Sequence, residues 1–542
     1  MAAKAQANVS PLSPNAVGRD IDMTRPAAIR ANIISRTGPR SGSSQLVIQL
    51  VSIHTHQTAA SKTAASSAPS GVRCASSRWL TWVMAKTKTR SKNSSTKLTR
   101  ACSPGRRTRI RLAAMPHPSL TLFRERAPVR AVRPEPQTSS VAPRLWEQVA
   151  AAFILFLLTG ALIGPIFAPQ QQELPALRLI WPPVYLIILG LMAFRARQMA
   201  AAWPAFILLA LMVILALASG LWSQAPDVTQ RRVLALALTG GFSIYLGVAF
   251  RGADLPRLLT WTFLALGVGS LIAVFLFPSL GVHHSANAGL WRGLWYEKNH
   301  MGMIMAVGLI AASALLAAGA PQDRRIAVAA IGVCALALLG SQSKTALIMA
   351  MLGGGLIAMC RLIARMGPVF GVVIVWSLGL TAVISLWVWS QYSVEILALF
   401  GKDPTLTGRT EIWAAIERMA AQRPWLGYGY GAFWVLDTEP MEWIRHETGW
   451  RVPSAHHGWL DLRVQLGWTG TWLVGAVIAL TATAILFRLN NLGRREGYLS
   501  LAYLAAFLLL SVSESVLMSH QDLPWTLFVA VLARNLASDR TA

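Results

Sequence analysis

Two adjacent histidines, His456 and His457, end a long polar segment directly before an apolar run. An imidazole titrates near neutral pH, so His456 could take a proton from an attacking hydroxyl group. The alternative is a histidine that only packs beside the apolar run. His457 is expected to orient its neighbour or to face water.

Arg409 precedes a short amphipathic stretch, in which Ile412, Ile416 and Met419 recur at helical spacing. The pattern predicts a helix over 408–421 with Arg409 in its first turn. The free backbone N–H groups and the positive end of the helix dipole at that turn favour an anion such as pyrophosphate. The alternative is a surface arginine paired with a nearby glutamate.

Further cations lie next to apolar runs. Lys344 follows a short polar turn, and a cation there is costly in lipid unless it faces a wet cavity or an anion. The alternative is a lysine that snorkels to the lipid headgroups. Arg292, Lys298 and Asn299 form a second polar group, for which we expect the same kind of role.

Tryptophans are concentrated in the polar segment 392–465, which holds six of the 21 in the chain. Trp413, Trp434 and Trp459 are candidates for stacking on sugar rings, because an indole offers a flat apolar face and one N–H donor. The alternative is anchoring at the boundary between membrane and water, where tryptophan collects.

The elements that position these residues are apolar runs of membrane-span length. Hydrophobic residues make up 54% of the 542 positions and charged residues only 13%, which indicates a polytopic membrane protein. About twelve spans are predicted, at 146–168, 177–194, 203–221, 233–250, 258–280, 300–320, 325–340, 344–361, 369–391, 466–487, 499–519 and 523–537.

Orientation follows from the connections between these spans. Every loop on one side carries at least two arginines, which places that side and the N-terminus in the cytoplasm. The polar segments 281–299, 341–343, 392–465 and 520–522 then all lie outside, where we expect them to build one site. Glu514, His520 and Asp522 either line the same cavity or support helix packing.

The first 145 residues form a basic tail before the membrane domain 146–537. Residues 1–114 carry 19 basic and two acidic side chains, and so +17 of the net charge of +27. Their Ser, Thr, Ala and Arg content predicts disorder, and Met115 is an alternative start. Scattered basic charge of this kind is usually solvated, so no nucleic-acid partner is expected. Four cysteines without ligand spacing give no disulfide framework and no metal site, and no cofactor is expected.

Three short blocks carry a resemblance to a known family. They are GLWRGLWYEKNHMG at 289–302, GRTEIWAAIERMAAQRPWLGYGYGAF at 408–433 and SAHHGWLDLRVQLGWTG at 454–470. The chain resembles the O-antigen ligase and polysaccharide polymerase superfamily of bacterial envelopes, and within it the ExoQ-type exopolysaccharide polymerases. The resemblance covers roughly residues 145–535. His456 matches the motif histidine of the family, Arg409 its loop arginine, and Lys344 a basic position that is often arginine.

The resemblance implies an all-α polytopic protein of GT-C-like architecture in the bacterial inner membrane, with its active site on the periplasmic side. It implies a metal-independent glycosyltransferase that polymerises polyprenyl-pyrophosphate-linked oligosaccharide repeats into exopolysaccharide. His456 would deprotonate the acceptor hydroxyl, while Arg409 and Lys344 would neutralise the departing pyrophosphate. Its partners would be that lipid-linked donor, membrane lipids, a chain-length regulator and export proteins.

Two alternatives remain. One is a ligase of the same superfamily, which moves a finished glycan onto lipid A core or protein. The other is a transporter or flippase of lipid-linked sugars. The single large outer loop and the lack of evident repeat symmetry between the two halves count against a transporter.

Overall fold

The computed structural model describes residues 142–163, 175–284, 287–399, 409–435, 438–449, 452 and 454–537. All of them lie in one compact unit that spans Arg126–Ala542. Apart from residues 142–145, the predicted basic tail lies outside the described residues, as does the alternative start at Met115.

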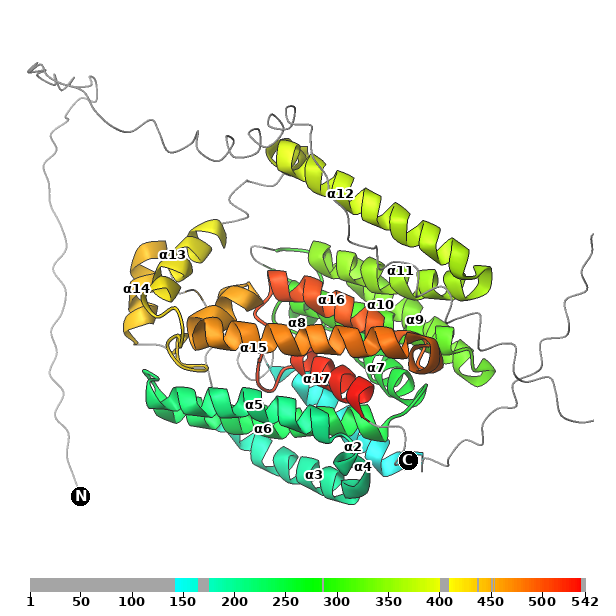
Figure 1. Ribbon diagram of the computed structural model, residues 1–542, viewed down its shortest axis with the longest axis horizontal. Helices are drawn as coiled ribbons and strands as arrows, with labels where there is room; N and C mark the ends of the chain where they lie inside the picture. Colours follow the sequence, from blue (N-terminus) through cyan, green and yellow to red (C-terminus); the bar gives the residue numbers. More distant parts are fainter. Residues whose placement is uncertain are drawn as a thin grey trace, which may run out of the picture. The chain divides into compact units, whose positions relative to one another are not determined.

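The described chain is helical (Figure 1), with a single isolated bridge between Val282 and Trp291. Its α-helices are α2 (Leu145–Leu158), α3 (Trp181–Phe194), α4 (Ala196–Ala200), α5 (Trp203–Ala218), α6 (Pro226–Ala249), α7 (Asp254–Leu276), α8 (Pro278–Gly281), α9 (Lys298–Ala318), α10 (Arg324–Ser341), α11 (Lys344–Met366), α12 (Pro368–Leu399), α13 (Arg409–Gln422), α14 (Glu439–Thr448), α15 (Gly458–Arg488), α16 (Leu499–Ser513) and α17 (Leu523–Leu536). Short 3-10 turns occupy Pro175–Ile180, Ser219–Leu221 and Pro321–Asp323, and a π-turn occupies Leu489–Gly493.

Nine segments of the described chain form helices long and apolar enough to cross a membrane. Three further apolar helices, α2, α16 and α17, have only 14, 15 and 14 residues. At about 1.5 Å per residue they are roughly 21 to 23 Å long, which is shorter than a hydrocarbon core of about 30 Å. The all-α polytopic class is therefore confirmed, whereas the count of twelve full spans is not.

The segment 514–522, which connects the short helices α16 and α17, lies inside the protein. All side chains of α17 from Leu523 to Asn535 are buried, and the helix packs against α5, α6, α15 and α16. Within the connection, Val516, Leu517 and Met518 are buried as well. At membrane depth, non-helical backbone is tolerated where protein buries it or where it lines a wet cavity. The 514–522 segment therefore presents its polar side chains to an internal space.

Helix α15 begins at Gly458 rather than at 466, and it is kinked at Gly467, where φ is +65°. A side chain at that position would be strained, and its Cβ would lie 2.2 Å from backbone atoms of the preceding loop. The kink leaves the carbonyl of Val464 free to accept a hydrogen bond of 3.0 Å from the N–H of Tyr428. The glycine-rich turn of the long loop is thereby tied to α15.

Ion pairs join neighbouring helices at the connections predicted to be cytoplasmic. Arg195, at the end of α3, lies 2.7 Å from Glu147 of α2, and Arg257 of α7 lies 2.7 Å from Asp323 before α10. These contacts fix the helix ends remote from the long polar loop. The orientation of the protein rests on the distribution of Lys and Arg and stays a prediction.

Cysteine labelling tests that orientation. In a chain without its natural cysteines, Glu439→Cys should react with a membrane-impermeant maleimide in intact spheroplasts, because Glu439 is exposed on the loop helix α14. Gln322→Cys, exposed in the turn before α10, should react only after permeabilisation. Asp323 is unsuitable, since it pairs with Arg257. The opposite labelling pattern would invert the topology.

Candidate active site

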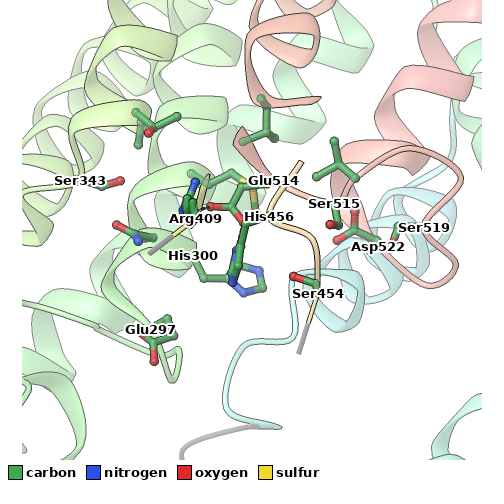
Figure 2. A pocket seen from close by; sticks show the side chains of 16 residues that line it. Glu297, His300, Ser343, Arg409, Ser454, His456, Glu514, Ser515, Ser519 and Asp522 are labelled. Atoms are coloured by element: carbon green, nitrogen blue, oxygen red, sulfur yellow. Dashed lines mark hydrogen bonds and ion pairs between the residues drawn. The ribbon is translucent and has the colours of Figure 1, made fainter. Parts of the chain in front are cut away.

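A pocket of about 650 Å³ lies among the first turns of α9, α11 and α13, the chain before α15 and the end of α16 (Figure 2). Its polar lining comes from Glu297, Asn299, His300, Ser343, Thr345, Arg409, Ser454, His456, Glu514, Ser515, Ser519 and Asp522. These residues come from all four polar segments that the sequence predicts on one side, from the first turns of α9 and α11, and from the connection after α16. The structure therefore brings the four segments together around one pocket.

Glu514 joins the two residues for which chemistry was predicted. Its Oε2 lies 3.1 Å from Nδ1 of His456, and its Oε1 lies 3.7 Å from Nη2 of Arg409. Arg409 also donates from Nη1 to the carbonyl oxygen of Ser513 at 3.1 Å. A carboxylate can only accept from the imidazole, so in the neutral ring Nδ1 carries the proton and Nε2 keeps its lone pair. The contact thus leaves Nε2 of a neutral His456 able to accept a proton.

Local backbone structure explains why Glu514 is within reach. Helix α16 ends at Ser513, and Glu514 takes an extended conformation. The carbonyl of Ser513 is one of the last in the helix, where the negative dipole end attracts the Arg409 guanidinium. A Cβ on Gly458 would lie 2.9 Å from the Ser511 carbonyl oxygen, so only glycine lets the start of α15 approach so closely.

The backbone of His456 is also unusual. Its φ of +46° is left-handed, a region that histidine visits more readily than most side chains. This conformation ends the polar loop one residue before the cap of α15 and accompanies the side-chain contact with Glu514. Figure 2 shows His456 beside Glu514 and Arg409.

His457, in contrast, supports the fold. It is the N-cap of α15, and its Nδ1 accepts a hydrogen bond of 3.2 Å from the N–H of Leu460. Its ring packs edge-on against Trp413, with 5.3 Å between the ring centroids. Burial lowers the pKa of His457, which favours the neutral imidazole that this acceptor role needs. The supporting role predicted for His457 agrees with this geometry.

The other predicted cations do not line the pocket. Lys344 begins α11 and is exposed, although its neighbours Ser343 and Thr345 are lining residues. Arg292 donates from Nε to the carbonyl of Leu280 at 2.9 Å and so stabilises the turn after α8. The structure therefore brings Arg409 into the site but leaves Lys344 at its edge.

Lys298 and Asn299 open α9 and differ in their placement. The backbone N–H of Lys298 donates to Nε2 of His283 at 3.2 Å, and burial lowers the pKa of His283. Asn299 lines the pocket, whereas Lys298 does not. Of this polar group, Asn299 is the residue whose amide can reach a bound ligand.

The three tryptophans proposed to hold sugars use their indole N–H groups for hydrogen bonds within the protein. The indole N–H of Trp413 donates to the carbonyl of Ala455 at 2.9 Å, and that of Trp459 donates to Oγ of Ser511 at 3.1 Å. Trp434 donates to Asp461. None of the three lines the pocket, and their contact with sugars stays a prediction.

Several lining residues were not proposed as site residues from the sequence. Glu514 was predicted only as one of two alternatives, either lining the cavity or supporting helix packing, and its charge in an apolar run is the signal that marks it. His300 lines the pocket from α9, with its ring stacked at 6.3 Å from that of Trp295. Burial raises the pKa of the Glu297 carboxyl, against the opposing charges of Arg292 and Lys298.

Comparison with known proteins covers part of this site. The sequence model of the O-antigen ligase family matches residues 326–475, a segment that includes both Arg409 and His456. A multi-pass helical membrane protein is also the fold that the resemblance of the three sequence blocks implies. Similarity to the O-antigen ligase and polysaccharide polymerase superfamily is confirmed.

Within that superfamily, the chain is similar to the exopolysaccharide production protein ExoQ of Rhizobium meliloti (strain 1021). The two are 31% identical over 209 residues, which are 37% of this chain and 42% of that relative. The matched region therefore spans less than half the length of the relative. The predicted likeness to ExoQ-type proteins is confirmed over this region.

Hydrogen–deuterium exchange tests the role of Glu514 in joining loop and bundle. Glu514→Ala should speed exchange near Arg409 and His456 by about ten-fold or more, since a charge-assisted hydrogen bond contributes about 1.5 to 3 kcal/mol. Glu514→Gln should have a smaller effect. Glu447→Ala is the control, because its pair with Arg418 lies on the exposed side of the loop. Unchanged exchange in Glu514→Ala would contradict the role.

Proposed function

We propose that this protein is an inner-membrane glycosyltransferase that polymerises polyprenyl-pyrophosphate-linked oligosaccharide repeats into exopolysaccharide on the periplasmic face. The observation that carries the proposal is the contact of Glu514 with both His456 and Arg409 inside the pocket. It supplies a base and a cation for one group transfer. The similarity to ExoQ, a protein of exopolysaccharide production, supports a polymer as the product.

The reaction we propose is a displacement at the anomeric carbon of the donor sugar. His456 Nε2 takes the proton of the acceptor hydroxyl, whose oxygen bonds to the anomeric carbon while the bond from that carbon to the pyrophosphate oxygen breaks. General-base assistance of this kind contributes about 10² to 10⁴-fold. The carboxylate of Glu514 stabilises the imidazolium that forms and holds the ring in one orientation.

Arg409 is the group that meets the charge on the leaving pyrophosphate. Its distance of 3.7 Å from Glu514 is long for a hydrogen bond, so the pair leaves guanidinium donors available to a ligand. A fixed cation and a hydrogen-bonding amide, Arg409 and Asn299, line the same pocket. Lys344 at the edge adds positive charge that attracts the donor headgroup, without bidentate binding.

The leaving-group charge can be met in this way without a metal ion, and we propose a metal-independent reaction with no cofactor. Among the described residues, no three His, Cys, Asp or Glu side chains are grouped to hold a metal. Developing negative charge is stabilised most when its partner is fixed in place beforehand. The contacts of Arg409 with Ser513 and Glu514 provide that fixation.

A ligase is the second candidate, and the match to the O-antigen ligase family over residues 326–475 favours it. The two enzymes would use the same donor chemistry and differ in the acceptor. A ligase would pass the glycan to lipid A core or protein, and a polymerase would pass it to another repeat. A gene neighbourhood with sugar transferases, a flippase and a chain-length regulator would favour the polymerase.

The first test concerns the base. In a deletion strain, His456→Ala should abolish exopolysaccharide while the protein stays at normal membrane levels and lipid-linked single repeats accumulate, because no group remains to deprotonate the acceptor. His457→Ala should be milder, since that residue caps α15. Polymer length and lipid-linked intermediates are measured by gel electrophoresis and mass spectrometry. Long polymer from His456→Ala would remove His456 from the mechanism.

The second test concerns the cations. With purified protein and lipid-linked donor, Arg409→Ala should lower turnover by about ten- to a hundred-fold, the effect of losing one charge-assisted contact. Lys344→Ala should have a smaller effect, because Lys344 lies outside the lining, and Lys344→Arg should keep most activity. Wild-type turnover in all three variants would show that neither Arg409 nor Lys344 binds the pyrophosphate.

The same assay tests metal independence. Activity should persist in excess EDTA, after dialysis against the chelator and without added divalent ions. Loss of activity that Mg²⁺ or Mn²⁺ restores would reject the metal-free mechanism while leaving the roles of His456 and Arg409 open to separate test.

A further inference from the structure

Three polar residues of the connection between α16 and α17 have no role in the reaction described so far. Ser515, Ser519 and Asp522 all line the pocket. Figure 2 shows them grouped on one side, with Arg409, Glu514 and His456 on the other. The pocket therefore has one part that contains the cation Arg409. Its second part is lined by the hydroxyls of Ser515 and Ser519 and the carboxyl group of Asp522.

Two atoms of this group are buried without a hydrogen-bond partner, namely Oγ of Ser515 and Oδ2 of Asp522. A buried polar group that lacks a partner costs about 1 to 3 kcal/mol, so such groups usually have a ligand or an ordered water. Here both atoms belong to residues that line one pocket. Both atoms can therefore form hydrogen bonds with a ligand in the pocket.

The connection is held in shape by contacts from other parts of the chain. The hydroxyl of Tyr430 donates to the carbonyl of Met518 at 2.6 Å, and Gln521 contacts the hydroxyl of Tyr185 through its amide. Met518 and Gln521 themselves have left-handed backbone, with φ of +52° and +54°. This turn is thus anchored from α3 and from the glycine-rich loop, and its polar side chains are fixed before a ligand binds.

The side chains of Ser515, Ser519 and Asp522 favour a ligand with neutral hydroxyl groups. A carboxyl oxygen accepts hydrogen bonds from hydroxyls, and a serine hydroxyl both donates and accepts. A pyrophosphate would be repelled by an ionised Asp522. Burial raises the pKa of Asp522 to about 7, against the effect of the backbone N–H groups of Leu523 and Trp525, so near neutral pH the carboxyl can also donate.

The geometry points to a sugar-binding subsite at Ser515, Ser519 and Asp522 that holds the acceptor end of the oligosaccharide, on the side of the pocket away from Arg409. This inference rests on the proposed function, because it takes the anion at Arg409 to be the leaving group. In a direct displacement the attacking hydroxyl approaches opposite the leaving group, which places the acceptor across His456 from Arg409. A pocket of about 650 Å³ can hold such a ligand in part.

Binding measurements with two probes separate the two ends of the pocket. The first probe is the oligosaccharide released by mild acid from the lipid-linked repeats of a deletion strain, and the second is undecaprenyl pyrophosphate. Affinities are measured by calorimetry on the full chain in nanodiscs. Asp522→Asn should weaken oligosaccharide binding by about ten-fold or more, and Ser515→Ala by about three- to ten-fold. Ser515→Ala should leave binding of undecaprenyl pyrophosphate unchanged, and Asp522→Asn should not weaken it.

Two further variants complete the design. Ser243→Ala is the control, because Ser243 is buried in α6, where its hydroxyl donates to the carbonyl of Thr239. Arg409→Ala should weaken undecaprenyl pyrophosphate and spare the oligosaccharide. If both Asp522→Asn and Ser515→Ala bind the oligosaccharide with wild-type affinity, the proposed subsite is wrong. The unpartnered polar atoms would then bind only water. Unchanged undecaprenyl pyrophosphate binding in Arg409→Ala would instead count against the proposed function.

Discussion

The site depends on one carboxylate, that of Glu514, which lies between an imidazole and a guanidinium from a different part of the chain. Two oxygens of a single group fix the proton position on His456 and hold Arg409 near it. An uncompensated carboxylate at this depth would be costly, and the two partners together reduce that cost. The same contacts join the long polar loop to the helical bundle. The same contacts therefore determine both the geometry of the site and the docking of the loop.

That interaction requires a helix that stops short. If α16 continued at full membrane length, Glu514 would lie on its surface and its backbone would be closed by helical hydrogen bonds. Because α16 ends at Ser513, a terminal carbonyl is free for Arg409 and the chain turns back through polar residues. Gly458 allows α15 to approach this end closely. The short helices α16 and α17 thus create the polar interior that the pocket occupies.

The sequence predicted the elements of the fold better than their ends. Apolar composition located the nine long and three short apolar helices. It nevertheless extended the eleventh span to 519, because Val516, Leu517 and Met518 are as apolar as a helix interior. His456 and Arg409 were identified through short blocks and both line the pocket. Their link to Glu514 crosses 58 residues from His456, and no local pattern encodes it. The tryptophans show a second limit of sequence reasoning. Residue type alone does not reveal whether an indole N–H already donates a hydrogen bond within the protein.

The division of charge in the pocket would set a direction for the proposed reaction. The cation Arg409 and the proposed base His456 come from the loop, whereas Glu514, Ser515, Ser519 and Asp522 come from the bundle. An anionic leaving group is attracted to the first set and repelled by an ionised member of the second, so a substrate with one anionic and one neutral end has one favourable orientation. Because His456 belongs to the loop but contacts Glu514 of the bundle, the proposed base takes this orientation only when the two are docked. In the proposed reaction, the same few charges would therefore govern both substrate orientation and assembly of the site.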